Sequence, residues 1–306
     1  KKAKLMTLSI VIPTKNRPNE LLAMLKSLII QTHLPDQIII VDQSLKENTI
    51  EDKLLSLLGL NKIKLNYIHD QNITGLVKAK AFAIKHNTCD IISFFDDDII
   101  LEPGYLKEIC FAFKQYPKIN GANGLILNTP NQNIIKRLIY RFTHLGLYKD
   151  NRQRLSKQCL RDNLHTPINV NNLSGGLSSW RSEVFKKVKF DVLNKFHCFE
   201  DVEYSIRFEK KFPDSMFLIP GAKLYHFHAT GNRESKIKQI SNHVEESILL
   251  FRKNNNFSNL GIDLLLIVFY FKINAIFHTI KHKEKRFIIS FFNGIKSGLS
   301  KKIKKN

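Results

Sequence analysis

Residues 8–13 read LSIVIP, an almost unbroken apolar run that is typical of a strand buried on both faces of a sheet. Over residues 20–31 the apolar side chains recur every three or four positions, which predicts a helix. The same alternation continues with strands at 37–42 (QIIIVD), 64–69 and 90–96 (DIISFFD), and with helices at 51–58, 76–86 and 103–116. Repetition of apolar strands and helices predicts an α/β fold with a mostly parallel sheet flanked by helices.

Polar residues stand where three of these strands end. Thr14 follows the first strand, Asp42 closes the second, and the acidic run 96–98 follows the strand at 90–96. In open parallel sheets, ligands bind beyond the carboxyl ends of the strands. The sequence therefore predicts a ligand site at this edge of the sheet.

The acidic run lies within FFDDDII (94–100). Three adjacent carboxylates beside an apolar strand repel one another and lose hydration, which is costly without a cation. Mn²⁺ and Mg²⁺ prefer oxygen ligands, above all carboxylates and substrate phosphates. The run therefore favours a Mn²⁺ or Mg²⁺ site, with a solvent-facing acidic turn that caps the next helix as the alternative.

Three further patterns admit a catalytic and a structural interpretation. Glu200 and Asp201 open a predicted helix, whose dipole favours ionised carboxylates, so that one of them can act as a general base; otherwise both only cap the helix. His226 and His228 alternate on a predicted strand and would face the same way, as a ligand pair would, although single histidines are more often structural. Trp180 could stack on a sugar ring or belong to the core.

The chain length, the cysteines and the net charge limit the domain organisation, the cellular location and the kind of partner. The 306 residues suit one large α/β domain with a smaller appendage. The four cysteines are scattered without a C-x-x-C pair, and the opening residues lack the apolar core of a secretory signal, so a cytoplasmic location is expected. The net charge is +21, and residues 231–306 hold 15 lysines and arginines against 5 acidic residues. This excess predicts an anionic partner, unless it is only a solvated basic surface.

Two regions depart from the strand–helix pattern. Residues 128–165 are basic and show no clear period, so we expect an excursion over the site, such as a lid. Residues 235–306 look helical, and the apolar run 264–271 is far shorter than the roughly 20 residues of a membrane span. With the lysines that follow, this run suggests helices lying on an anionic membrane surface, or alternatively a buried core helix with a basic tail.

Seven segments resemble the family 2 glycosyltransferases in order and spacing. They are SIVIPTKNR (9–17), IVDQS (40–44), NITGL (72–76), FDDD (95–98), SGGLSSWR (174–181), FEDVEYSIR (199–207) and YHFH (225–228). The resemblance covers about residues 7–230. It implies a GT-A fold over 1–234, with a donor half at about 7–127 and an acceptor half at about 128–234, followed by a basic helical region at 235–306. It also implies inverting transfer from a nucleoside-diphosphate sugar.

The resemblance implies roles for individual residues. Asp98, Asp96 and His226 would hold Mn²⁺ or Mg²⁺, with His228 as the alternative histidine. Asp201 would be the general base, with Glu200 beside it. The residues expected to bind the nucleotide sugar are Pro13, Thr14, Arg17, Asp42, Gly75, Lys80, Asp96, Asp97, Gly175 and Gly176. Contacts to the acceptor are expected from Trp180, Arg181 and His228.

The chain departs from the family pattern at two places. Lys80 and Ala81 stand where the family usually has arginine and then asparagine, and a lysine meets a phosphate without a bidentate fork. Gln43 separates Asp42 from Ser44 where the family usually shows D-G-S. The second departure suggests a subgroup with a different donor.

We therefore expect a glycosyltransferase that acts on a saccharide or lipid-linked acceptor in the synthesis of a cell-surface polysaccharide, such as a capsule or lipopolysaccharide, peripherally at the inner face of the membrane. A nucleic-acid-binding protein would suit the charge, but the basic residues form no recognisable reading motif. A non-catalytic nucleotide-sugar-binding protein would not need Asp201. A nucleotidyltransferase would need a glycine-rich loop where TKNRP (14–18) stands, and an aspartyl phosphotransferase would carry its D-x-D on the first strand.

Overall fold

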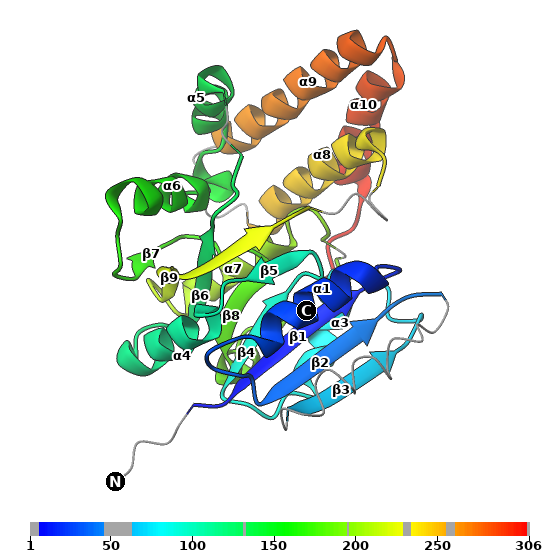
Figure 1. Cartoon of the computed structure of the whole chain (residues 1–306). Helices are drawn as coiled ribbons and strands as arrows, with labels where there is room; N and C mark the ends of the chain where they lie inside the picture. The colour runs from blue at the N-terminus through cyan, green and yellow to red at the C-terminus, as the bar shows by residue number, and fades with distance from the viewer. Residues whose placement is uncertain are drawn as a thin grey trace. The chain divides into compact units, whose positions relative to one another are not determined.

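The computed structural model describes residues 6–45, 63–130, 133–194, 196–228, 234–254 and 261–304 (Figure 1). The helix expected at 51–58 lies outside these residues. The chain divides into two compact units, which are described separately. The first unit comprises residues 1–129, 151–190 and 207–232, and the second comprises 130–150, 191–206 and 233–306.

Within the described residues of the first unit, nine strands form one sheet. Eight of them run in the order β3-β2-β1-β4-β8-β6-β9-β5, and the short β7 (Ile168–Asn169) pairs with β9. The bounds are β1 (Leu8–Thr14), β2 (Gln37–Asp42), β3 (Lys64–His69), β4 (Ile91–Phe95), β5 (Ile99–Leu101), β6 (Gly121–Ile126), β8 (Leu177–Arg181) and β9 (Met216–His226). The strands β1 to β4 pair in parallel, whereas β8 is antiparallel to β4 and β6, and β5 is antiparallel to β9. The predicted mostly parallel α/β sheet is confirmed.

The strand register brings the polar strand ends together. Thr14 lies opposite Asp42, and Asp42 lies opposite His69. β4 pairs with β1 in the same direction, so the acidic run after β4 begins at the same edge. The expected gathering of polar groups at the carboxyl edge is therefore present.

Helices cover both faces of this sheet (Figure 1). α1 (Pro18–Ile29) and α4 (Tyr105–Gln115) bury their apolar faces against one side, where Leu21, Leu25 and Leu106 join the core. α3 (Leu76–Ile84) packs against β1 and β2 from the other side. α6 (Arg152–Asp162) and the 3-10 turn η2 (Ser182–Lys186) complete the unit.

The second unit is helical. Its elements are α5 (Ile134–Thr143), the 3-10 turn η1 (Gly146–Tyr148), α8 (Lys236–Lys253), α9 (Ile262–His282) and α10 (Arg286–Ser300). α7 (Glu200–Lys211) begins in this unit and continues into the first. Val244 and Ile248 of α8, Ile267 and Phe271 of α9, and Phe291 of α10 build a separate apolar core.

Several expectations need correction. The segment 128–165, which shows no clear period in sequence, forms α5 and α6; an Asn133 side chain caps α5. Residues 216–226 form one long strand, β9, with a register shift opposite β6. β9 ends at His226, and His228 takes a positive φ of 50°, so the two histidines do not alternate along one strand.

The second unit contains residues 130–150 and 191–206 together with the C-terminal helices. The apolar run at 264–271 is part of the 21-residue helix α9. Among the described residues, α9 is the one helix whose length and mean hydropathy of 1.5 would suit a membrane span, so the expected shortfall in length was wrong.

Candidate functional site

The acidic run forms the turn between β4 and β5. Asp96 follows the last residue of β4, and its backbone N–H donates to the carbonyl of Gly176 at 2.9 Å. Asp97 and Asp98 lead into β5, and both are buried. The five residues of β4 that come directly before the turn are all buried, and four of them are apolar, so the carboxylates stand at the carboxyl edge of a well-packed sheet.

Asp97 fastens this turn to β1 and the loop that follows it. The Thr14 hydroxyl donates to Asp97 Oδ2 at 2.7 Å, and the Arg17 guanidinium donates to Oδ1 at 3.0 Å. Arg17 also lies 3.6 Å from Asp98 Oδ2. Burial raises the pKa of Asp97 to about 6, and the hydrogen bonds from Thr14 and Arg17 oppose that rise. Two residues expected to touch the nucleotide thus also hold the acidic turn in place.

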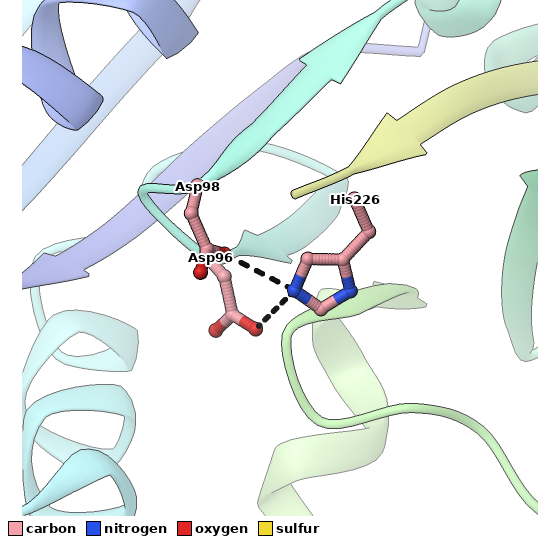
Figure 2. A group of neighbouring side chains, drawn as sticks. All are labelled: Asp96, Asp98 and His226. Carbon is pink, nitrogen blue, oxygen red and sulfur yellow. Dashed lines mark ion pairs between the residues drawn. The ribbon is translucent and has the colours of Figure 1, made fainter. Parts of the chain in front are cut away.

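Asp96, Asp98 and His226 converge on one point (Figure 2). His226 Nε2 lies 3.1 Å from Asp98 Oδ1 and 3.8 Å from Asp96 Oδ2. The antiparallel pairing of β5 with β9, which sets Ile99 opposite His226, brings these residues together. Desolvation raises the pKa of Asp96, and the positive charges of Lys80 and His226 oppose this effect.

The donor set of this cluster fits a divalent ion. One ligand atom from each of the three residues lies within 4.8 Å of the others. Two carboxylates and an imidazole suit Mn²⁺, and the carboxylates also suit Mg²⁺. A Cβ atom at Gly176 would lie 2.0 Å from Asp96 Oδ2, so the glycine leaves the space that this carboxylate fills. The expected metal ligands are therefore adjacent, and the ring of His228 lies tilted beside that of His226, with the centroids 3.9 Å apart.

A second polar cluster surrounds Asp42 at the end of β2. The Asp42 side chain is fully buried; its Oδ1 accepts from the backbone and hydroxyl of Ser44, and its Oδ2 accepts from the Tyr67 hydroxyl at 2.6 Å. The Gln43 amide oxygen accepts from the backbone of Gly75 at 2.8 Å. Sequence reasoning missed Ser44 and Tyr67, although the parallel pairing of β2 with β3 would place polar residues of β3 beside Asp42.

Lys80 is buried rather than displayed at the surface. Its side chain is 1% exposed, and its ammonium lies 5.8 Å from the ring centre of Phe94 and 5.7 Å from that of Phe190. Its charge acts on Asp96 through the protein interior. The buried position of Lys80 therefore gives no support to a direct contact with a phosphate. It is compatible with an electrostatic effect on Asp96.

Of the three residues expected to contact the acceptor, His228 lies beside His226, whereas Trp180 and Arg181 have other partners in the first unit. Trp180 is 2% exposed, packs edge-on against Phe208, and donates its indole N–H to Ser178. Arg181 pairs with Ile91 at the start of β4, opposite the edge that carries Asp96, and donates to the carbonyls at 113 and 119. This geometry gives no support to an acceptor contact by either residue.

Glu200 and Asp201 lie in the second unit, in the first turn of α7. This turn also holds Glu203, and Asp201 Oδ1 accepts from the backbone of Val202 at 2.9 Å. The buried Glu246 of α8 accepts from the three backbone N–H groups just before the helix, those of residues 197–199, at 2.7–3.0 Å. The start of α7 is thus held by a residue that the sequence did not single out.

Comparison with known proteins identifies the family. Residues 9–231 match the family described as Glycosyl transferase family 2. The chain belongs to this family. Part of this family 2 chain is 28% identical to an uncharacterized glycosyltransferase of Haemophilus influenzae, over 37% of the chain and 36% of that relative. Another part-length match, to an uncharacterized glycosyltransferase of Rickettsia conorii, is 30% identical over 37% of the chain and 20% of the relative. The matches thus span about a third and a fifth of the relatives' lengths.

Solved structures share the fold of this family 2 chain. A crystal structure of GalNAc-T7 with UDP, GalNAc and Mn²⁺ has a TM-score of 0.61 at 14% identity, covering 82% of this chain and 48% of that one. The structure of S. aureus TarS 1–349 has a TM-score of 0.55 at 13% identity, covering 95% and 81%. The TarS complex with UDP has the same TM-score at 14% identity, over 90% and 73%. The GT-A fold expected from the sequence is therefore confirmed.

Proposed function

We propose that this family 2 chain transfers a sugar from a nucleoside-diphosphate sugar to a saccharide acceptor, with inversion at the anomeric carbon. The observation that carries the proposal is the convergence of Asp96, Asp98 and His226 at the carboxyl edge of the sheet. Structures of the same fold contain UDP, and one of them also contains Mn²⁺. Family membership supports glycosyl transfer over other uses of a divalent ion.

The first unit would bind the donor. Asp96, Asp98 and His226 would hold Mn²⁺ or Mg²⁺, which when bound neutralises the charge of a departing diphosphate. Arg17 keeps Asp97 and Asp98 in place, and Lys80 adds positive charge from the interior. The other residues expected near the donor are Pro13, Thr14, Asp42, Gly75, Gly175 and Gly176. Because Asp42 accepts hydrogen bonds from Ser44 and Tyr67, it would also order the loop that meets the nucleoside.

Asp201 would act as the general base. Inversion requires that the acceptor hydroxyl lose its proton as it attacks the anomeric carbon, and a carboxylate can take that proton. The position of Asp201 in the first turn of α7 favours its ionised form. Glu200, also in this turn and buried, would support the position of the base.

The acceptor is proposed to be a phosphorylated or lipid-linked saccharide in the synthesis of a cell-surface polysaccharide at the cytoplasmic face of the membrane. The net charge of +21 supports an anionic partner. Part of this positive charge lies on α5, which carries Lys136, Arg137 and Arg141, and part lies on the C-terminal helices.

A thermal-shift panel of nucleotide sugars, with and without Mn²⁺, tests donor binding because a ligand that binds the folded state raises its stability. We expect one nucleotide class to raise the melting temperature only when Mn²⁺ is present, and Asp98→Ala to abolish that shift. Asp201→Asn should keep the shift and lose transfer by roughly 10²-fold or more. Equal transfer by wild type and Asp201→Asn would remove the base assignment; a donor shift unaffected by Asp98→Ala would remove the metal assignment.

The charge also supports a second candidate, binding of nucleic acid. Such binding would weaken steeply with salt and would survive Asp98→Ala. A gel-shift titration with single-stranded DNA separates the two. Retention of DNA binding without any nucleotide-sugar response would favour this second function.

A further inference from the structure

α9 carries apolar side chains on two opposite faces. One face, which includes Ile267, Phe271 and Ala275, is buried in the core of the second unit. The other face is exposed to solvent. Its members are Ile262, Leu265, Phe269, Ile273, Ile276 and Ile280, whose side chains are 36–72% exposed. They recur every three or four residues, so they form one stripe along about 27 Å of helix. We call these six residues the α9 stripe.

The neighbouring helix α5 adds a second exposed stripe. α5 lies beside one end of α9 (Figure 1). The rings of Tyr140 and His144 on α5 have their centroids 6.5 and 4.8 Å from that of Tyr270 on α9. Its own exposed apolar residues are Ile134, Ile135, Leu138 and Phe142, at helical spacing. Exposed apolar surface of this extent on adjacent helices is typical of an interaction face.

Basic residues accompany both stripes. α5 carries Lys136, Arg137 and Arg141, and exposed Lys272, Lys281, Lys283 and Lys285 lie on α9 or just after it. Acidic residues are scarce, because residues 261–304 contain only Asp263 and Glu284. Asp263 is buried and accepts from the backbone of Leu147 at 3.2 Å, and Glu284 pairs with Arg286. The face that α9 presents is therefore apolar along its centre and positive in charge around it.

We propose that the α9 stripe docks into the headgroup layer of an anionic lipid bilayer. A helix with an exposed apolar stripe and basic neighbours binds in the plane of such a surface, since apolar burial and attraction to anionic lipids act together. α9 does not cross the bilayer in this arrangement, because its opposite face and Asp263 are packed in protein. A second copy of the chain is a poorer occupant, because the two basic surroundings would repel each other. The proposal is independent of glycosyl transfer.

Co-sedimentation of the full chain with vesicles tests this proposal. The probes are vesicles of phosphatidylcholine alone and vesicles with phosphatidylglycerol added. We expect binding that needs phosphatidylglycerol and weakens with salt. The triple variant Leu265→Ser, Phe269→Ser, Ile280→Ser should bind roughly tenfold or more weakly, as should Lys281→Glu, Lys283→Glu, Lys285→Glu. These positions are exposed, so circular dichroism and the melting temperature should stay near wild type.

A matched control removes exposed apolar side chains elsewhere. Ile30→Ser with Phe111→Ser changes exposed residues of the first unit and should leave vesicle binding unchanged. Equal binding by the triple serine variant and wild type would overturn the proposal, as would equal binding to both vesicle types. A lipid-free wild-type dimer that the triple serine variant converts to a monomer would also overturn it, in favour of a second copy on this face.

Discussion

Gly176 lies against Asp96 so closely that a Cβ atom there would meet the Asp96 carboxylate at 2.0–2.2 Å. The same glycine accepts the Asp96 backbone N–H at its carbonyl, so its backbone cannot easily withdraw. Its side-chain position is therefore reserved for the carboxylate that, with Asp98 and His226, forms the proposed metal site. This explains the glycine that stands directly before β8.

The first prediction follows from that contact. Gly176→Ala should displace the Asp96 carboxylate and weaken Mn²⁺ binding by about tenfold or more, in the range seen when the support of a metal ligand is lost. Isothermal titration of Mn²⁺ measures the effect. Gly104→Ala is the matched control, since nothing lies within 4 Å of a Cβ at that glycine. Unchanged Mn²⁺ affinity in Gly176→Ala would show that Asp96 is not a ligand.

The second prediction concerns the buried hydrogen bond from Thr14 to Asp97. Thr14→Val removes a donor to the ionised carboxylate, so the pKa of Asp97 should rise further above about 6. The loss in free energy of unfolding should be about 1–3 kcal/mol at pH 8, where Asp97 is ionised, and smaller at pH 5, where it is protonated. Urea unfolding at both pH values measures it.

A control for this prediction is Thr32→Val. The Thr32 hydroxyl donates to the carbonyl of Pro103 from an exposed position, where water can replace the bond. Its loss should cost roughly 0.5 kcal/mol or less at both pH values. If Thr14→Val behaves like this control, the hydrogen bond from Thr14 to Asp97 does not contribute to the stability of the folded chain.

The sequence predicted those features of the fold that depend on local pattern. Apolar runs such as 8–13 and 37–42 are strands, and the acidic run stands at a strand end because its neighbours on both sides are apolar. The pairing of His226 with Asp98 depends on β5 lying antiparallel to β9, across more than a hundred residues of chain. No local pattern carries that register; the histidine pair suggested a ligand, but only the family resemblance placed His226 at the metal site.

Tertiary packing explains why some residues do not lie where the sequence led us to expect them. Trp180 and Lys80 look like ligand-binding residues by type, yet both are buried, because aromatic rings of Phe208, Phe94 and Phe190 surround them. The helix α5 was not predicted, although its apolar residues lie at helical spacing; these residues face solvent, and the basic residues among them led us to expect an irregular excursion. A sequence pattern assumes that apolar means buried, and this helix breaks that assumption.

The third prediction concerns Glu246, which we expect to position the start of α7. Its carboxylate accepts from the backbone N–H groups of residues 197–199, directly before Glu200 and Asp201. Glu246→Gln replaces one acceptor oxygen with a donor that faces those N–H groups. We expect the turnover number to fall tenfold or more while the dissociation constant of the donor stays unchanged. Steady-state kinetics and donor titration together measure this split.

Glu245→Gln is the control for that prediction, because the neighbouring Glu245 pairs with Lys301 and Ser297, away from α7. It should leave turnover near wild type. This prediction and the base assignment can fail separately. A normal Glu246→Gln beside an inactive Asp201→Asn would reject only the positioning role, whereas an active Asp201→Asn would reject the base itself.

The last prediction is a pH dependence of stability from His144. Its ring stacks on Tyr140 at 3.6 Å between centroids and meets Tyr270 at 4.8 Å. Burial lowers the pKa of His144 to about 4, whereas an unfolded histidine titrates near 6.5. Between these pH values the unfolded chain binds more protons than the folded one, so the free energy of unfolding contributed by this residue rises with pH and is complete above about 6.5.

The variant His144→Phe keeps an aromatic ring in the stack but cannot be protonated. The stability advantage of wild type over His144→Phe should therefore be smallest near pH 4 and grow as the pH rises to about 6.5, then stay constant. Urea midpoints at half-unit intervals from pH 4 to pH 8 measure the difference. His86→Phe provides the comparison, since it replaces an exposed histidine that lies beside Phe82. A flat difference for His144→Phe would mean that the ring takes up a proton as readily in the folded chain as in the unfolded one.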